Sequence, residues 1–277
     1  MAMADIDRAG QVVAPYLAAE GTYVIPQLME APPVGCFYLN SLVIQGREPV
    51  IVDTGTLINR DLWLEQVFAL VDPADVRWIF LSHDDPDHTG NLDPVLEMCA
   101  NAVLVTTWFG VGRMADHLEI PMERVRFVRD GDSFDAGDRT LTAVRPPLFG
   151  NPTTRGLFDA TTGVYWASDA FAMSVPHAVD DVAALDGDYV DEALLFGARL
   201  IAPWHAWLDP AKWNTHLQRV RAMPIDVIAS CHAPVIGGRD IDRAFAVLGS
   251  APQADPWPEF SQHDLDGWMA AAGIEAP

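Results

Sequence analysis

The six residues His83-Asp84-Asp85-Pro86-Asp87-His88 place the strongest demand on how this chain can fold. Two imidazoles and three carboxylates lie side by side, and like-charge repulsion makes such a run costly unless a cation neutralises it. A pair of divalent metal ions would turn that cost into binding energy. Because the run contains a proline and follows the apolar segment 78–81, it predicts a loop at the end of a strand rather than a helix. A solvated acidic turn is the alternative, and the histidines at both ends disfavour it.

Short apolar runs alternate with helical patterns along the first half of the chain. They predict strands over 37–44, 49–52, 78–81 and 102–106, and helices over 62–71 and 91–100. The second half has turn signals and predicts strands over 139–144, 157–160, 164–167 and 225–229, and a helix over 209–221. Because polar clusters follow several of these strands, the pattern predicts an α/β fold in which two β-sheets pack face to face with helices outside.

The end of the chain differs in composition from the rest. Segment 251–258 is rich in proline and aspartate, and a helical pattern follows over 261–272. We therefore expect this last helix to be released from the body of the protein. The predicted organisation is one α/β domain over 1–250 and a C-terminal helical appendage over 251–277.

Composition disfavours some classes of partner. The net charge is −22, and so acidic a chain repels phosphate backbones and anionic lipid, which argues against nucleic acid and membrane surfaces. No apolar run approaches the roughly 20 residues that cross a bilayer, and residues 1–16 lack an apolar secretory core, so we expect a cytoplasmic protein. Three cysteines, Cys36, Cys99 and Cys231, lie far apart and form no thiolate metal motif. Cys231 adjoins His232, which invites a redox role, but a buried core residue is the favoured interpretation.

Four landmarks, in order along the chain, resemble those of the metallo-β-lactamase superfamily. The motif H-x-[HDE]-x-D-H after a short strand matches residues 83–88, and Asp53-Thr54-Gly55 resembles the family's early D-T-G turn. Ser168-Asp169-Ala170-Phe171 and Ser230-Cys231-His232 resemble the strand-end aspartate and the late histidine. Asp85 stands where hydrolytic members usually carry histidine, and a carboxylate there is similar to the flavodiiron and oxygen-binding di-iron branch. The resemblance covers about 23–238 and implies an αββα sandwich of two mixed sheets.

The resemblance also implies a dinuclear metal centre with six ligands: His83, Asp85, Asp87, His88, Asp169 and His232. The first metal would take His83, Asp85 and Asp169. The second would take Asp87, His88, Asp169 and His232, so that Asp169 bridges the two. Three carboxylates and three imidazoles form an oxygen-rich set that favours iron, although zinc or manganese can also occupy it. Asp87 would be the catalytic residue that orients a metal-bound nucleophile, and Asp84 would face away, to orient a histidine or to meet solvent.

One position departs from the family's pattern. The resemblance places a middle histidine near residues 147–152, and Phe149 occupies the corresponding place. The first metal would then be one ligand short, with water or an external ligand in the gap. Three substitutes stay open: Asn151 could supply an amide oxygen, and His177 or His205 could approach from another loop.

Three functions are compatible with these residues. A di-iron protein would bind or reduce O2 or NO with electrons from a separate flavoprotein, because no flavodoxin or rubredoxin segment follows, and by resemblance it would form a homodimer. A metal-dependent hydrolase would direct a bridging hydroxide at an ester, thioester or phosphodiester, which Asp85 and the absent histidine disfavour. A non-catalytic relative with a depleted metal site would explain Phe149. The di-iron protein is the preferred hypothesis.

Overall fold

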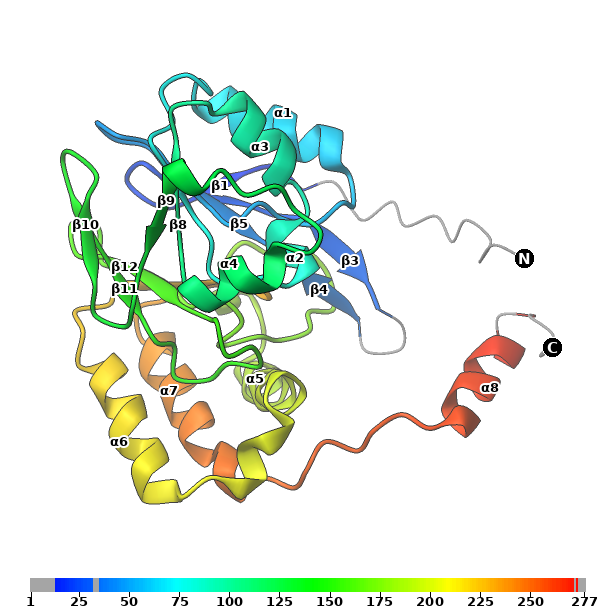
Figure 1. Cartoon of the computed structure of the whole chain (residues 1–277). Helices are drawn as coiled ribbons and strands as arrows, with labels where there is room; N and C mark the ends of the chain where they lie inside the picture. The colour runs from blue at the N-terminus through cyan, green and yellow to red at the C-terminus, as the bar shows by residue number, and fades with distance from the viewer. Residues whose placement is uncertain (1–12, 32–34, 272, 274–277) are drawn as a thin grey trace.

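The computed structural model describes residues 13–31, 35–271 and 273, and these form a layered α/β sandwich (Figure 1). The first sheet has the strand order β1-β2-β5-β6-β7-β8-β9. Its strands are β1 Tyr16–Ala19, β2 Thr22–Ile25, β5 Ser41–Ile44, β6 Val50–Val52, β7 Trp78–Phe80, β8 Val103–Thr106 and β9 Val125–Phe127. The second sheet has the order β10-β11-β12-β13-β14-β15. Its strands are β10 Ser133–Asp135, β11 Thr140–Val144, β12 Gly156–Asp159, β13 Val164–Trp166, β14 Val227–Ser230 and β15 Ala233–Gly237.

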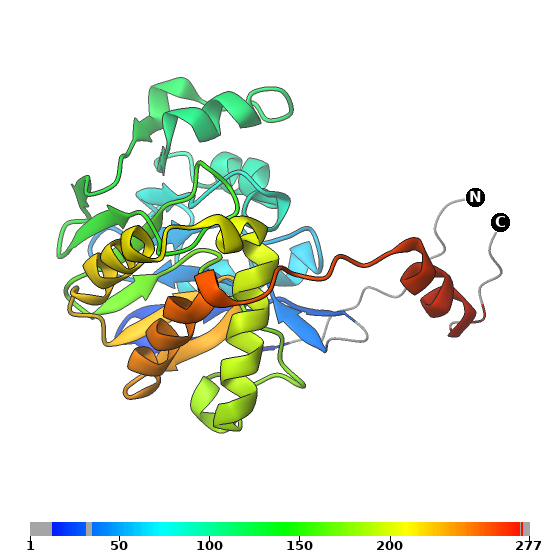
Figure 2. The ribbon, with the colours of Figure 1, turned by 90° about the horizontal axis from the view of Figure 1, so that it is seen from below.

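Helices cover the outer face of each sheet (Figures 1 and 2). The first sheet carries α1 Arg60–Leu70, α3 Leu92–Met98 and α4 Trp108–Met114. The second carries α5 Gly187–Ile201, α6 Pro210–Arg221 and α7 Asp240–Ser250. The remaining elements are short or peripheral: a hairpin of β3 Leu28–Glu30 and β4 Cys36–Tyr38, the helix α2 Pro86–Thr89, the terminal α8 Gln262–Ala271, and 3-10 turns at Met122–Arg124, Val182–Ala184, Pro203–Trp207 and Ala251–Gln253.

Alternation along the strands produces the layers. Val50 and Val52 of β6 lie in the cluster between the two sheets, whereas Ile51 packs with α1 and α3 on the outer side. In the second sheet Val164 and Trp166 face inward, and Tyr165 faces the helices. Because successive side chains of a strand point to opposite faces, sheets buried on both sides need apolar residues at every position. The predicted fold, two mixed sheets with outer helices, is confirmed.

Some predicted elements differ in the structure. The single strand predicted over 37–44 is divided, because Leu39 N–H donates to Gln27 and Asn40 N–H donates to Cys231, which takes these two residues out of the ladder. Helices α4, α5 and α7 were not predicted. Helix α6 begins as predicted, with Asp209 accepting hydrogen bonds from two N–H groups of its first turn.

The C-terminal helix α8 lies apart from the layers, at the end of an extended segment (Figures 1 and 2), and none of its residues is buried. The division into a domain over 1–250 and an appendage over 251–277 stays a prediction. Within the described part of the chain, no helix is both long and apolar enough to cross a bilayer.

Candidate metal centre

The six predicted ligands follow strand ends that meet at one edge of the sandwich. The segment 83–88 follows β7, Asp169 follows β13, and His232 follows β14. Strands β6 and β7 run parallel to each other, as do β13 and β14. Parallel neighbours bring their carboxyl ends to the same edge, which is where open α/β sheets bind ligands. Residues from both sheets therefore converge there.

Asp87 and His88 lie in the one-turn helix α2, so the loop predicted for this run is wrong at these positions. Pro86 takes the first helical position, which suits proline because an N–H there would have no partner within the helix. The carbonyl of Asp85 accepts hydrogen bonds from the N–H groups of His88 and Thr89, at 3.0 and 3.1 Å. Three of the predicted ligands are thereby fixed in one local unit.

Asp169 lies at the middle of the cluster and turns its two carboxylate oxygens in different directions. Oδ2 lies 3.4 Å from His83 Nε2. Oδ1 lies 3.0 Å from His88 Nε2 and 3.4 Å from His232 Nε2. A carboxylate with one oxygen toward each of two sets of imidazoles has the arrangement needed to bridge two cations. The preceding residue, Ser168, has a φ of 55°, a strained value for a non-glycine residue that is found at functional sites.

The other two carboxylates belong to separate sides of Asp169. Asp85 Oδ2 lies 3.3 Å from His83 Nε2, and contact with this imidazole lowers the pKa of Asp85. Asp87 Oδ2 lies 3.6 Å from His88 Nε2 and 3.4 Å from His232 Nε2. The structure thus brings all six residues together. Their shortest contacts follow the two groups that the resemblance implied, and His88 also lies near His83 and Asp169. Their role as metal ligands stays a prediction.

In each of the three histidines Nε2 faces the centre, and Nδ1 lies within hydrogen-bond distance of another group. His232 Nδ1 lies 2.9 Å from the backbone oxygen of Tyr38, which can only accept, so Nδ1 carries a proton and the neutral ring would offer Nε2 to a metal ion. His83 Nδ1 lies 3.1 Å from Ser168 Oγ. His88 Nδ1 lies 2.8 Å from Asp53 Oδ2. Outer partners of this kind fix the orientation and tautomer of metal-binding histidines.

Asp53 connects this centre to both sheets. Its side chain is fully buried, and it accepts hydrogen bonds from the N–H and Oγ of Ser82 and from the indole of Trp166, at 2.6 to 3.0 Å, in addition to the contact with His88. Its φ of 56° is a second strained value at this edge. Asp53 therefore orients His88 and joins it to both sheets.

The chemistry of these donors fits a cation. His88 Nε2 and Asp169 Oδ1 are buried and lack a hydrogen-bond partner within the described part of the chain, although they lie 3.0 Å apart. Buried polar atoms normally find partners, so two such atoms turned toward the same space indicate a missing third group. Burial opposes the ionisation of Asp169, but the surrounding imidazoles outweigh it and hold the pKa of this carboxyl well below its usual range. An ionised carboxylate among inward-facing imidazole nitrogens is suited to bind a metal ion.

A family model shows to which family the chain belongs. The model described as ODP family beta lactamase matches residues 38–233, a span that contains all six residues. The chain belongs to the ODP beta-lactamase family. It is similar to the anaerobic nitric oxide reductase flavorubredoxin of Vibrio vulnificus, with 26% identity over 71% of this chain and 40% of the relative.

Two solved structures share the fold of this ODP-family chain. The flavodiiron protein from Giardia intestinalis has a TM-score of 0.77 at 18% identity, over 88% of this chain and 60% of that one. Rubredoxin oxygen:oxidoreductase from Desulfovibrio gigas has a TM-score of 0.75 at 17% identity, over 87% of this chain and 62% of that one. The chain spans 26 to 33% of the length of the first three curated relatives it matches. The two structures show a shared fold.

Asn151, rather than Phe149, lies beside the first group of ligands. The Phe149 ring packs 5.8 Å from the ring of Trp204 and lies under the guanidinium of Arg145. Asn151 Nδ2 donates to Asp85 Oδ1 at 2.8 Å, and its Oδ1 accepts from the N–H of Thr153 at 2.9 Å. The amide oxygen is therefore already engaged, so the predicted use of Asn151 as an oxygen ligand is disfavoured. Its amide orients a predicted ligand instead.

The other two candidates for the missing ligand are also accounted for. His205 is buried, with Nδ1 2.7 Å from the backbone oxygen of Ala251, next to the 3-10 turn that precedes the C-terminal segment. His177 is exposed. Neither is among the groups of side chains in the described structure that could hold a metal ion.

Asp84 faces away from the two groups, as predicted, but it does not orient a histidine. It accepts hydrogen bonds from Asn151, Thr153 and Arg113. Asp84 therefore fixes Asn151, which in turn holds Asp85. The sequence carried no signal for this chain of contacts, because Arg113 and Thr153 lie outside every motif.

Asn151→His is expected to strengthen binding of the first metal ion, because the new imidazole would start beside Asp85. We expect the dissociation constant of the first metal ion to fall about tenfold or more, because an added protein ligand replaces solvent. Competitive titration of zinc against a chromophoric chelator measures this constant. Phe149→His is the matched control and should leave it unchanged. If only Phe149→His tightens binding, the assignment of the ligand position to Asn151 is wrong.

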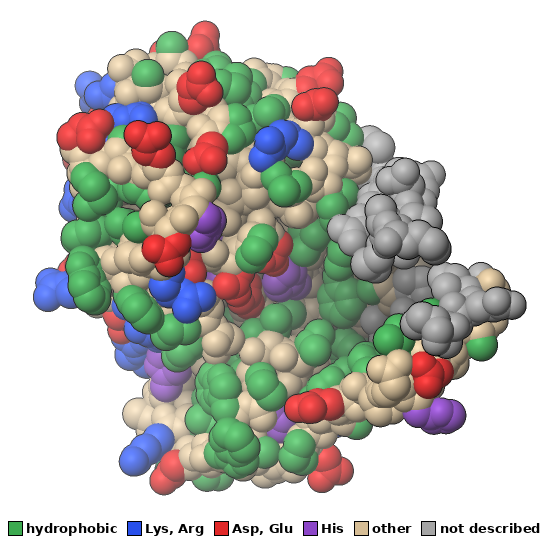
Figure 3. Space-filling model, turned by 45° about the vertical axis from the view of Figure 1, so that its right-hand side comes forward, with side chains coloured by type: hydrophobic (Ala, Val, Ile, Leu, Met, Phe, Trp, Pro, Cys, Tyr) green, Lys and Arg blue, Asp and Glu red, His purple; other side chains and the backbone are tan. Residues whose placement is uncertain are grey.

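A cavity of about 800 Å³ opens onto the second group of ligands. Asp87 and His232 belong to its wall, and apolar side chains such as Leu39, Leu57 and Leu200 form most of the rest. Figure 3 shows histidine and acidic side chains gathered in a hollow with hydrophobic side chains around it. Among the described residues that line the cavity, none is lysine or arginine. It suits small uncharged molecules better than anionic ones such as phosphodiesters.

Proposed function

We propose that this chain is a di-iron protein that binds or reduces O2 or NO with electrons from a separate protein, a flavoprotein by analogy with its relatives. The relatives and neighbours that support this carry the words nitric oxide reductase, flavodiiron protein and oxygen:oxidoreductase in their names. The chain spans only part of their length, so their complete activities are not transferred without a test. We further propose that it works as a homodimer, as the resemblance implies.

The observation that carries the proposal is the position of Asp169 between two sets of inward-facing imidazoles. A set of three carboxylates and three imidazoles favours iron or manganese, whereas zinc prefers softer ligands. Iron, when bound, supplies the change of oxidation state that reduction of O2 or NO needs. Asp53 and the carbonyl of Tyr38 hold His88 and His232 in place, so the ligand positions are set before any metal arrives.

The cavity supports the same substrate class. It leads to Asp87 and His232, which belong to the second group of ligands, through a wall that is mostly apolar. Small uncharged gases enter such a space readily, whereas an anionic ester would meet no lysine or arginine among the described residues of its wall. This is why we place the hydrolase second. Asp87 and His232 are the proposed ligands that face both the cavity and the centre, and about a quarter of the Asp87 side chain is exposed.

Loading the metal-free protein with ferrous iron and titrating it with NO under anaerobic conditions tests the proposal. We expect binding of about two irons per chain and an iron–nitrosyl absorbance that saturates with NO. The zinc-loaded protein is the control and should stay colourless. Iron binding without any NO signal, together with turnover of bis(p-nitrophenyl) phosphate by the zinc form, would overturn the proposal in favour of a hydrolase. Light scattering of the loaded protein checks the dimer, and a monomer would contradict that part.

A further inference from the structure

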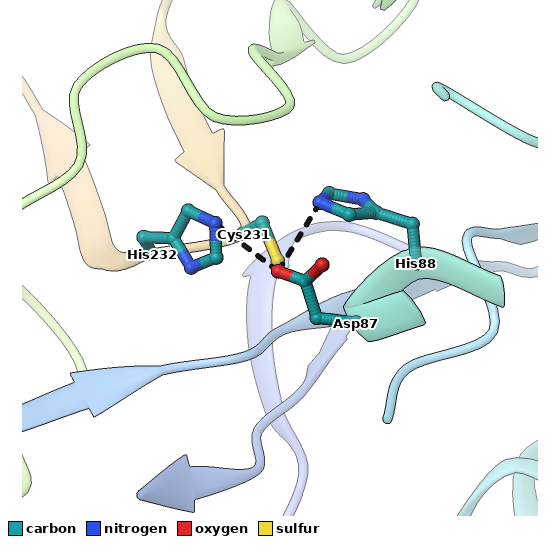
Figure 4. Close-up of side chains that lie close together, drawn as sticks. All are labelled: Asp87, His88, Cys231 and His232. Atoms are coloured by element: carbon teal, nitrogen blue, oxygen red, sulfur yellow. Dashed lines mark ion pairs between the residues drawn. The ribbon is translucent and has the colours of Figure 1, made fainter. Parts of the chain in front are cut away.

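The thiol of Cys231 lies inside the second group of ligands. Ligand atoms of Asp87, His88, Cys231 and His232 all lie within 4.8 Å of one another. Figure 4 shows the sulfur of Cys231 directed toward the Asp87 carboxylate, between the rings of His88 and His232. The residue is fully buried and forms no disulfide. The sequence favoured a core residue at this position, and burial agrees with it, but burial does not explain the three polar neighbours.

The backbone fixes where this thiol points. The N–H of Cys231 donates to the carbonyl of Ser168 at 2.9 Å, and its carbonyl accepts from the N–H of Asn40 at 2.8 Å. The side-chain amide of Asn40 also donates to the carbonyls of Ser230 and Ala233, which flank Cys231 and His232. Cys231 is thereby held between β14 and β15, and its neighbour His232 turns toward the same centre. The backbone that carries the thiol is therefore anchored beside the centre.

Unpartnered buried atoms give a second, independent indication. His88 Nε2 and Asp169 Oδ1 are buried without a hydrogen-bond partner among the described residues. His88 Nε2 is one of the atoms that cluster with the Cys231 sulfur. A cation at their common focus would satisfy the nitrogen, the carboxylates and the sulfur together.

We propose that Cys231 is a thiolate ligand of the second metal ion, an inference that rests on the dinuclear centre proposed above. When the metal binds, the S–H bond breaks, a sulfur–metal bond forms and the proton passes to solvent. Three carboxylates leave one positive charge on a pair of divalent ions, and the thiolate cancels it. The ligand sets of the two ions would then differ, because the first ion has a single imidazole and the second has two imidazoles and a sulfur.

Cys36 and Cys99 are matched controls for this proposal. Both are buried free thiols, Cys36 in the cluster on the outer face of the second sheet and Cys99 in that of the first. Neither belongs to a group of metal-ligating side chains in the described structure. Replacing each by serine removes a buried sulfur without touching the centre.

Cobalt substitution of the full chain tests the ligand directly. With two equivalents of Co(II) bound, we expect a sulfur-to-cobalt charge-transfer band in the near ultraviolet. Cys36→Ser and Cys99→Ser should keep the band. Cys231→Ser should lose it, and its affinity for the second cobalt ion should fall about tenfold or more. Bound cobalt without this band in the wild-type protein would overturn the thiolate ligand and leave the dinuclear centre intact. Failure to bind cobalt at all would overturn both.

X-ray absorption of the wild-type protein covers the case in which Cys231→Ser does not fold. At the zinc edge of the zinc-loaded chain we expect one sulfur scatterer at about 2.3 Å from one of the two ions. A first shell made only of nitrogen and oxygen would exclude Cys231 as a ligand.

Discussion

Asp169→Ala is expected to release both metal ions together. Its two oxygens face different groups of ligands, Oδ2 toward His83 and Oδ1 toward His88 and His232. Removing the shared carboxylate takes one donor from each ion and the charge that holds the two cations near each other. We expect metal content after gel filtration to fall from about two ions per chain to nearly none. Elemental analysis by plasma mass spectrometry measures it.

Single-ion variants provide the comparison for Asp169→Ala. Asp85 contacts only the first group, through His83, and Asp87 contacts only the second, through His88 and His232. Asp85→Ala and Asp87→Ala should therefore each leave about one ion per chain. Full metal content in Asp169→Ala, with loss in the other two, would refute the bridging role.

Asp53→Ala should cause the largest loss of stability. The fully buried carboxylate accepts from Ser82, Trp166 and His88, so its removal leaves several buried donors without an acceptor. Asp53 and His88 form a buried ion pair, and losing one partner of such a pair costs about 3–5 kcal/mol. Urea denaturation of the metal-free protein, in the presence of a chelator, measures the free energy of unfolding without a contribution from metal binding.

Two further substitutions define what Asp53 does. Asp53→Asn keeps the volume but replaces one oxygen by an N–H2 group that would meet other donors, so it should also lose stability. Asp75 is exposed, and Asp75→Ala should change the free energy of unfolding by no more than about 0.5 kcal/mol. A loss below about 1 kcal/mol for Asp53→Ala would show that its hydrogen bonds are not needed.

The layers of the fold could be predicted because their signal is local. Runs such as Val50–Val52 and Val164–Trp166 are apolar at every position, which is what a strand covered on both faces requires. The missed elements are the strands β1 to β3, β9, β10 and β15 and the helices α4, α5 and α7. In α5, Gly187 and Gly197 weaken the local helical signal, yet Gly197 is required there because an added Cβ would collide with the backbone of Ala172.

The predicted ligands share a motif or a strand end, which is why the sequence could indicate them. Their supports could not be indicated in the same way. The carbonyl that holds His232 belongs to Tyr38, 194 residues away, and Asn151 reaches Asp84 across 67 residues. Neither contact depends on a recognisable side-chain pattern. The sequence placed Phe149 where the family's middle histidine is expected. The packing of its ring on Trp204 depends on tertiary structure, which the sequence pattern does not show.

Anomalous X-ray diffraction from crystals of the iron-loaded protein, recorded at the iron edge, tests the dinuclear centre most directly. We predict two peaks about 3.5–4 Å apart, one beside His83 and Asp85 and the other beside His88 and His232, with the Asp169 carboxylate between them. A single peak, or two peaks that do not share Asp169, would contradict the account.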